Sequence, residues 1–432
     1  MDFGSLLLAV AAAWGLLTLL IRRPAARPLF GVYARPGRWY NLKYAAFLLL
    51  LQLRRLRRNK DGKAEPAGMG VASRNSPAEM ERPQQLPDDR KHPNAVDAVY
   101  FNGADQLGNN LIMAASRRQR NLLQCLSILR LRGVGLLEHP SHPDTNFTAT
   151  EGGGFSKSDM RIECLEPMQT WRLEFDGEMT LLPEAEAEKR RRQLGTTGGG
   201  CGGRVRVRAQ LTWRALHRQF DFDTDQDSHP LAEAVASEEW SQEMFKRLES
   251  VHQTHYEQFG EITGPVYVDD EKVADLKLQG ARDHSYGNHR VWSDLYRYGL
   301  QYIYLQDRTC IAIGCVSMPN YLSNLVIGFV CTPDGRVSPV RQSDFRLYNE
   351  GQDGRPSTDF RIRCLAGGRT YTVQCRAADQ AVFCMGTAAE VRIYERFCDF
   401  EVNGIRGWGV SEWCYRSSEP WPAWEHAEQS AA

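Results

Sequence analysis

The feature that most constrains the fold of this chain is a long series of short segments in which apolar and polar residues alternate. Examples are MQTWRLEFDGEMTLL, GPVYVDDEKVADLKLQG and AEVRIYERFCDFEVNG. Turn-forming pairs punctuate the series at Asp176-Gly177, Asp334-Gly335 and Asn403-Gly404. Alternation with a period of two is typical of half-buried strands, and Asp-Gly and Asn-Gly favour tight hairpin turns. The pattern predicts a mainly β fold made of antiparallel sandwiches or barrels.

The first fifty residues have a different character. Residues 3–21 are uncharged and long enough to span most of a ~30 Å hydrocarbon core. The charged residue before this stretch is Asp2, whereas Arg22 and Arg23 follow it directly. This asymmetry favours a retained transmembrane anchor over a cleaved signal peptide, with the following chain in the cytosol. We therefore predict an anchor over residues 1–23 and a single-pass membrane protein. The 11 cysteines, which show no zinc-like spacing, agree with a reducing compartment.

Two further segments precede the globular part. Residues 24–58 contain the apolar run from Tyr44 to Leu53, which is too short for a second span and ends in a cluster of arginines. Such a sequence predicts an interfacial helix on anionic lipid. Residues 59–94 are polar and rich in Pro, Lys, Asp and Glu, so they are predicted to form a disordered linker.

The remaining strand-like segments are long enough for two domains. We predict a first β domain over residues 95–270 and a second over 271–417, with a disordered tail over 418–432. Within the first domain, the charged and glycine-rich residues 184–203 indicate an insertion loop, and residues 230–248 have helical composition. The balance of 53 basic and 53 acidic residues gives no indication of a nucleic-acid partner.

Several motifs together suggest a family. They are DAVYFNGADQLGNNLIMAASRR, IECLEPMQTWRLEFDG, HYEQFGEITGPVYVDD, GARDHSYGNHRVW and ERFCDFEVNGIRGWGVSEWCYR, in this order between residues 97 and 416. The combination resembles the N-terminal region of animal phosphoenolpyruvate synthase-like proteins. It is remotely similar to the hydroxyneurosporene synthase (carotenoid hydratase) and AttH-like superfamily. The resemblance implies two tandem lipocalin-like β domains, and barrels of this type can hold one apolar ligand in the lumen. The chain has no glycine-rich nucleotide site, so we do not expect the phosphotransfer reaction.

The motif from Gly280 to Trp292 has the highest density of candidate site residues. We predict that the preceding strand stops at Gly280 and that a polar turn follows. Asp283 beside His284 provides an acid or base near neutral pH if burial raises the pKa of the carboxyl group. Glu257 is a second candidate, because two carboxylates in one cavity push their pKa values apart. The resemblance to the hydratases implies that Asp283 is the proton donor to an alkene.

The other polar residues near this motif are candidate ligand contacts. These are His255, Tyr256, Arg282, Tyr286, Arg290 and Trp292. A structural alternative is that Arg282 or Arg290 forms an ion pair with Asp283, which would lower the pKa of that carboxyl group and remove it as an acid. Glu412 lies among aromatic residues and has no assigned role. The spacing of the nearby histidines matches no zinc motif, so we expect neither a metal nor a cofactor.

Two functions remain open from the sequence. One is cofactor-free hydration or isomerisation of an apolar lipid, such as an isoprenoid, delivered from the membrane. The other is a non-catalytic binding or interaction module, related to the accessory region of phosphoenolpyruvate synthase-like proteins. A closed apolar cavity lined by Asp283 and Glu257, with no arginine in contact, would favour the enzyme. An ion pair of Arg282 or Arg290 with Asp283 on a filled barrel would exclude it.

Overall fold

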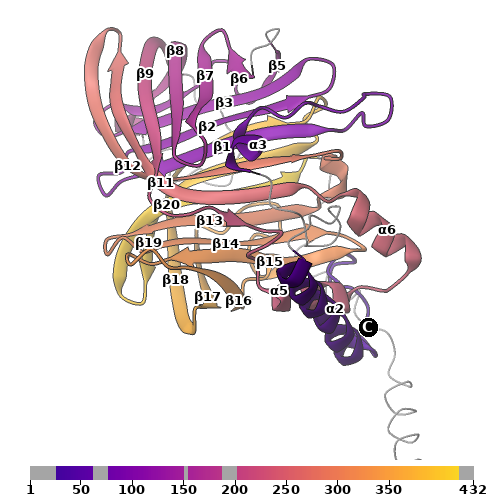
Figure 1. The fold of residues 1–432 in the computed structure, drawn as a ribbon. Helices are drawn as coiled ribbons and strands as arrows, with labels where there is room; N and C mark the ends of the chain where they lie inside the picture. Colours follow the sequence, from indigo (N-terminus) through magenta and orange to yellow (C-terminus); the bar gives the residue numbers. More distant parts are fainter. Residues whose placement is uncertain (1–25, 62–75, 150–153, 187–201, 418–432) are drawn as a thin grey trace, which may run out of the picture.

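Two antiparallel β structures stack on one another and make up most of the molecule (Figure 1). The computed structural model describes residues 26–61, 76–149, 154–186 and 202–417. The predicted anchor, the predicted tail and most of the predicted insertion loop lie outside these residues. The prediction of a mainly β, antiparallel fold is confirmed.

Twelve strands form the first β structure. They are β1 (Val96–Ala104), β2 (Asn110–Arg118), β3 (Leu122–Leu131), β4 (Gly135–Glu138), β5 (Asn146–Thr148), β6 (Phe155–Lys157), β7 (Met160–Glu166), β8 (Thr170–Pro183), β9 (Gly203–Ala215), β10 (Phe220–Asp221), β11 (Thr254–Val268) and β12 (Glu271–Gly287). Neighbours in the sheet follow the order β11-β12-β1-β2-β3-β4-β8. Because β9 pairs with both β8 and β11, it joins the two sides into a ring, here called the first barrel.

Alternating apolar side chains fill the interior of the first barrel. Phe101, Trp171, Leu211, Trp213 and Ile262 come from four different strands, and each is at most 2% exposed. The rings of Phe101 and Trp171 lie 5.5 Å apart. The turn predicted at Asp176-Gly177 is wrong, because β8 continues through this pair while it remains hydrogen-bonded to β9.

The second barrel is closed and has the up-and-down order β13-β14-β15-β16-β17-β18-β19-β20. Its strands are β13 (Arg297–Leu305), β14 (Cys310–Met318), β15 (Leu322–Cys331), β16 (Val337–Ser343), β17 (Asp359–Ala366), β18 (Arg369–Met385), β19 (Val391–Val402) and β20 (Ile405–Arg416). Lipocalins share this simple topology. The turns predicted at Asp334-Gly335 and Asn403-Gly404 are confirmed, and both Asn403 and Gly404 have positive φ, as a tight hairpin requires. A cluster of buried apolar side chains fills the lumen.

The boundary between the two β structures lies later than the predicted residue 271. Strand β12 pairs with β11 on one side and with β1 on the other, so it belongs to the first barrel over its whole length. The second barrel begins at β13, after the short 3₁₀ helix η2 (Trp292–Asp294). Two other 3₁₀ turns are η1 (Glu184–Glu186), at the start of the predicted insertion loop, and η3 (Leu347–Asn349).

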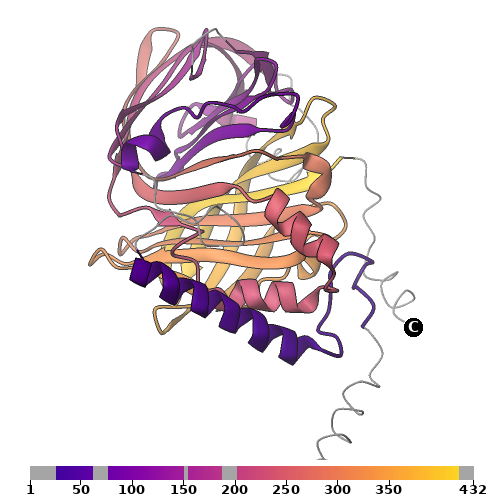
Figure 2. The same ribbon diagram turned by 45° about the vertical axis from the view of Figure 1, so that its right-hand side comes forward.

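The helices lie outside the barrels. They are α2 (Tyr40–Asp61), α3 (Pro77–Glu81), α5 (Ser228–Ser237) and α6 (Gln242–Ser250). The single helix predicted over residues 230–248 is therefore two short helices, each with its own N-cap, Asp227 and Ser241. Figure 2 shows α2 lying beside α5 against the second barrel. No helix in the described ranges is both long and apolar enough to cross a bilayer.

Segments that precede the first strand close one end of each barrel. Glu81, from the predicted linker, is 1% exposed and lies 3.0 Å from the guanidinium group of Arg282 inside the first barrel. That guanidinium group also packs on the rings of Trp213 and Tyr256, at 5.0 and 5.5 Å. In the second barrel, the hydroxyl group of Tyr33 donates to Gln352, which also accepts from Arg297. Residues 76–94 are therefore not a free linker.

The ion pair between Glu81 and Arg282 should contribute strongly to stability. Replacing Glu81→Ala leaves the guanidinium charge buried with no carboxylate, which should lower the free energy of unfolding by about 3–5 kcal/mol. The matched control is Glu163→Ala, which removes a partly exposed partner of Arg161 and Arg172 and should cost less than about 1 kcal/mol. Urea unfolding of both variants measures the difference. Equal losses of stability in the two variants would contradict the role of the Glu81–Arg282 ion pair as a buried plug of the first barrel.

Candidate active site between the two barrels

Strand β12 separates the residues of the Gly280–Trp292 motif onto two faces. The strand continues to Gly287, so the predicted stop at Gly280 is wrong. It continues because residues 281–286 form backbone pairs with β1 and with β11 at the same time. Successive side chains of a strand point to opposite faces. Arg282 and His284 therefore point into the first barrel, whereas Asp283 points away from it, toward the second.

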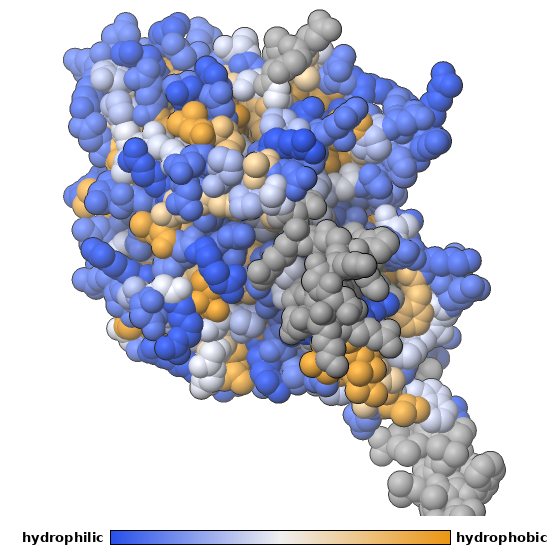
Figure 3. All heavy atoms as spheres, viewed as in Figure 1, coloured by the Kyte–Doolittle hydropathy of each residue, from blue (hydrophilic) through white to orange (hydrophobic). Residues whose placement is uncertain are grey.

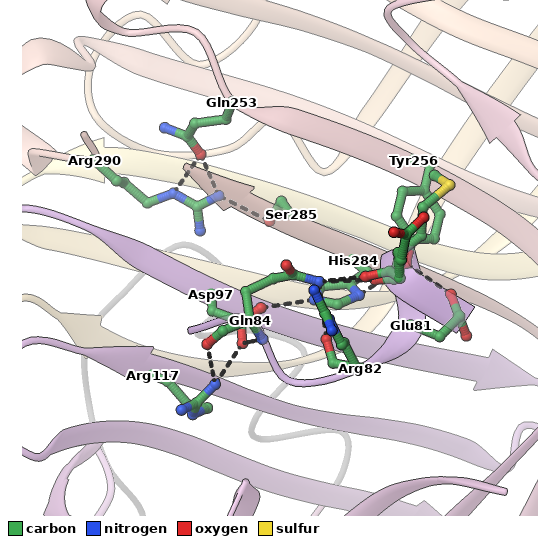
Figure 4. Close-up of polar contacts among 12 residues, drawn as sticks. Glu81, Arg82, Gln84, Asp97, Arg117, Gln253, Tyr256, His284, Ser285 and Arg290 are labelled. Carbon is green, nitrogen blue, oxygen red and sulfur yellow. Dashed lines mark hydrogen bonds and ion pairs between the residues drawn. The ribbon is translucent and has the colours of Figure 1, made fainter. Parts of the chain in front are cut away.

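The inward residues form a closed chain of polar contacts (Figure 4). Nε2 of His284 lies 2.7 Å from Asp97, and its Nδ1 lies 2.8 Å from the hydroxyl group of Tyr256. That hydroxyl group lies 2.7 Å from Glu81. All four side chains are at most 1% exposed. Because both ring nitrogens of His284 are occupied on the far face of the sheet, His284 cannot act together with Asp283, and the predicted Asp-His pair is not formed.

The outward residues bring the two predicted carboxylates together. Glu257 on β11 and Asp283 on β12 are direct cross-strand partners, so their side chains leave the same face of the sheet side by side. His255 lies on this face too, with its Nε2 3.2 Å from Glu257. Glu257 is only 3% exposed, whereas 28% of the His255 side chain remains exposed. These three residues face the second barrel.

The second barrel contributes two more carboxylates to the same space. Glu395 on β19 and Glu412 on β20 are cross-strand partners, and both are buried. Tyr298 donates to Glu412, and Tyr100 of β1 donates to Glu395 at 3.2 Å across the interface. Tyr302 likewise donates to Glu257 at 3.3 Å. We call this set the inter-barrel acid site: Tyr100, His255, Glu257, Asp283, Tyr298, Tyr302, Glu395 and Glu412.

Two carboxyl groups in the inter-barrel acid site titrate close to neutral pH. Burial raises the pKa of Asp283 to about 6; the charge of Glu257 adds to the rise, and His255 and Arg290 oppose it. Burial also raises the pKa of Glu412 to about 7, helped by the charges of Asp283 and Glu257 and opposed by the hydrogen bond from Tyr298. Of the two carboxyl groups, Glu412 therefore has the higher pKa and holds its proton to the higher pH.

Burial also shifts the pKa values of the surrounding groups. Burial and the charge of Glu412 raise the pKa of Glu395 well above its usual range, against the hydrogen bond from Tyr100. Burial keeps the phenols of Tyr100, Tyr298 and Tyr302 neutral, because it raises their pKa values well above 10. Burial lowers the pKa of His255, but its hydrogen bond to Glu257 and the charge of Asp283 outweigh this, and the net shift is upward.

No arginine forms an ion pair with Asp283 in the described part of the chain, although the charge of Arg290 lowers the pKa of this carboxyl group. Within the described ranges, this carboxylate forms no ion pair. Arg282 pairs with Glu81 on the other face of the sheet. Arg290 donates to Gln253 at 2.9 Å and to Ser285 at 2.8 Å, as Figure 4 shows. The structural alternative, an Arg282 or Arg290 plug on Asp283, is therefore wrong, although Arg282 does plug the first barrel with a different partner.

The remaining predicted residues lie elsewhere. Tyr256 and Arg282 belong to the plug, and the ring of Tyr286 packs 5.2 Å from His284 on that side. Trp292 packs against an apolar cluster that includes Phe383 and Met385. Four histidines considered as metal ligands each pair with a different carboxylate: His252 with Asp223, His255 with Glu257, His284 with Asp97 and His289 with Asp294. The described part of the chain contains no group of three or more potential ligands arranged around one metal ion.

Three cavities lie near these residues. One of about 510 Å³ is lined by His252, Tyr286 and His289. A cleft of about 810 Å³ lies between the α3 segment and β6–β8, and its lining includes Glu81 and Trp171 as well as the ion pairs of Lys157 with Asp159 and Arg161 with Glu163. A much smaller space, about 10 Å³, adjoins Glu257, Gln301 and Tyr302. This small space touches the inter-barrel acid site.

A family model described as "Family of unknown function (DUF8627)" matches residues 6–415. The chain belongs to this family. No curated protein matches the sequence. Among solved structures, the chain is similar to a protein assigned as AttH from Nitrosomonas europaea, with 10% identity, a TM-score of 0.46 and coverage of 77% of this chain and 97% of that one. It is also similar to kievitone hydratase from Nectria haematococca, with 10% identity, a TM-score of 0.45 and coverage of 78% and 97%.

A third similar structure is CghA with Sch210972, with 9% identity, a TM-score of 0.42 and coverage of 82% and 98%. At this level of identity and TM-score, the three likenesses carry no functional argument. The expected resemblance to phosphoenolpyruvate synthase-like proteins finds no support in the family description or in these three structures.

The raised pKa of Glu412 predicts a specific pH dependence of stability. Its folded pKa of about 7 lies above the ordinary value of 4.5, so the folded state holds a proton that the unfolded chain releases. Stability should be full below about pH 4.5 and should fall as the pH rises to about 7. Glu412→Gln keeps an acceptor for Tyr298 but cannot ionise. It should therefore be more stable than the wild type at pH 8 by on the order of 2–3 kcal/mol, with little difference at pH 4.5.

Urea unfolding at both pH values measures this difference. Glu163→Gln is the control, because it removes an exposed carboxylate and should leave the pH profile unchanged. A profile for Glu412→Gln that falls with pH as steeply as the wild type would contradict the assignment.

Proposed function

We propose that the protein is a cofactor-free acid/base enzyme that hydrates or isomerises an apolar alkene at the inter-barrel acid site. The observation that carries the proposal is the meeting of four carboxyl groups from two barrels with no arginine paired to Asp283. Buried acids that titrate near pH 7 are the groups that general acid/base catalysis requires. Structural carboxylates of a protein core are usually neutralised by a basic partner instead.

The two titrating groups take different roles. Glu412, with the higher pKa, supplies the proton, and Asp283, with the lower pKa, accepts one. Transfer of the Glu412 proton to one alkene carbon leaves a carbocation at the other. In a hydration, water adds to the cation and its surplus proton goes to Asp283. In an isomerisation, Asp283 removes a proton from the adjacent carbon instead. The aromatic faces of Tyr100 and Tyr302, stacked 6.1 Å apart, provide an environment that stabilises the cation.

The small space beside Glu257 favours hydration. Its volume of about 10 Å³ suits a single water molecule. Oε2 of Glu257 adjoins it, and in the described part of the chain this oxygen is buried without a hydrogen-bond partner. A water molecule held here by that carboxylate lies next to the carboxyl groups that exchange protons. The remaining exposed surface of His255 and Asp283 gives an apolar substrate access from outside.

Solvent deuterium provides a direct test. Full-length protein is incubated in D₂O with a membrane lipid extract and, separately, with isoprenoid alkenes. Because the first step bonds a solvent-derived proton to carbon, both reactions should place deuterium in a C–D bond, which mass spectrometry detects. Asp283→Asn and Glu412→Gln should each lower the rate of incorporation by about 10²–10⁴-fold.

His284→Gln and Glu163→Gln serve as controls. His284 lies on the other face of β12, so a folded His284 variant should retain incorporation, and Glu163 is remote from the site. Lipid that is retained without deuterium incorporation would favour the non-catalytic binding module. If neither lipid binding nor deuterium incorporation is observed, both functions are contradicted.

A further inference from the structure

One face of helix α2 concentrates the exposed apolar surface of the protein. In the described ranges, ten large apolar side chains are exposed, and six of them lie between residues 39 and 56: Trp39, Leu42, Leu49, Leu50, Leu53 and Leu56. Leu42, Leu49 and Leu56 are each more than half exposed and recur every seven residues, which places them on one side of the helix. Figure 3 shows this apolar surface along the lower edge of the molecule.

The opposite face of α2 is fixed to the protein. Phe47 and Leu51 are 2% and 4% exposed and pack in a cluster with Ala232 and Val235 of α5. Phe47 also contacts the ring of Trp240 at 6.3 Å. These contacts fix the rotation of α2 about its axis. The side that carries Leu42, Leu49 and Leu56, here called the leucine face, therefore points away from the protein. Its exposure is therefore not a consequence of a loosely attached helix.

The surrounding sequence is strongly basic. Residues 22–60 contain eleven Arg or Lys and no Asp or Glu, although the whole chain is electrically balanced. Arg27 and Arg35, which precede α2, are exposed. A helix with an outward leucine face in a positively charged setting matches the chemistry of an anionic bilayer surface. A second copy of this face is a poor partner, because each copy would bring the same positive charge.

We propose that the leucine face of α2 lies on the surface of an anionic lipid bilayer. The uncharged stretch of residues 3–21 precedes α2 by fewer than twenty residues and has the length of a membrane span. The anchor predicted there from the sequence would hold α2 at the bilayer surface and raise the local concentration of lipid at its face. This surface is separate from the inter-barrel acid site, so the proposal does not depend on the proposed function.

Site-specific photo-crosslinking tests the proposal in the full-length chain. A benzophenone amino acid is placed at Leu49, which is 56% exposed, and in a matched variant at Leu107, which is 53% exposed and lies in the turn after β1. Each variant is reconstituted into phosphatidylcholine vesicles with or without phosphatidylserine. Lipid adducts are expected at Leu49 and not at Leu107. Their yield should fall by about fivefold or more without phosphatidylserine, the change expected from about 1 kcal/mol of attraction per basic residue.

Four results would overturn the proposal or the part of it that requires anionic lipid. The first is the absence of lipid adducts at Leu49, and the second is adducts to another protein chain in their place. The third is an equal lipid yield at Leu49 and Leu107, which would mean that neither position has a preferred contact. An unchanged yield at Leu49 without phosphatidylserine would overturn the requirement for anionic lipid.

Discussion

The position of the Arg282 charge inside the first barrel determines much of the rest of the structure. A buried guanidinium group needs a carboxylate and aromatic surfaces around it, and Glu81, Trp213 and Tyr256 provide these. Because side chains alternate along β12, an inward Arg282 requires an outward Asp283. The register of β12 thus places Arg282 in the plug of the first barrel and Asp283 between the two barrels.

The chain before the first strand connects to both barrels. Glu81 closes the first barrel, and Tyr33 is fully buried at the end of the second, where it shares Gln352 with the guanidinium group of Arg297. Arg297 packs on the ring of Tyr415 at 4.6 Å, much as Arg282 packs on Trp213. The two barrels therefore use the same device, a buried arginine on aromatic rings, and both depend on residues that precede the β structure.

The sequence was informative where a pattern is local and uninformative where contacts are distant. Period-two alternation was sufficient to predict the β fold, and the motifs around Asp283 identified three members of the site, Asp283, Glu257 and His255. It did not reveal that Asp283 and His284 point apart, because the strand was predicted to end at Gly280. Tyr100, Tyr298, Tyr302 and Glu395 were missed, since each resembles an ordinary strand residue until the barrels meet. Glu81 was missed because its polar surroundings are typical of a linker.

Burying the carboxyl groups between the barrels lowers the stability of the folded protein. Apolar contacts hold the interface together, such as Phe220 stacked on Phe329 at 4.5 Å, and a fold selected for stability alone would extend such contacts across it. Instead, Glu257, Glu395 and Glu412 are buried beside Asp283, where the charges of Asp283 and Glu257 raise the pKa of Glu412 and the charge of Glu412 raises that of Glu395. Neutral isosteres would relieve this repulsion and keep the hydrogen bonds from tyrosine. Retaining four ionisable groups in one buried space is therefore better explained by proton transfer than by packing.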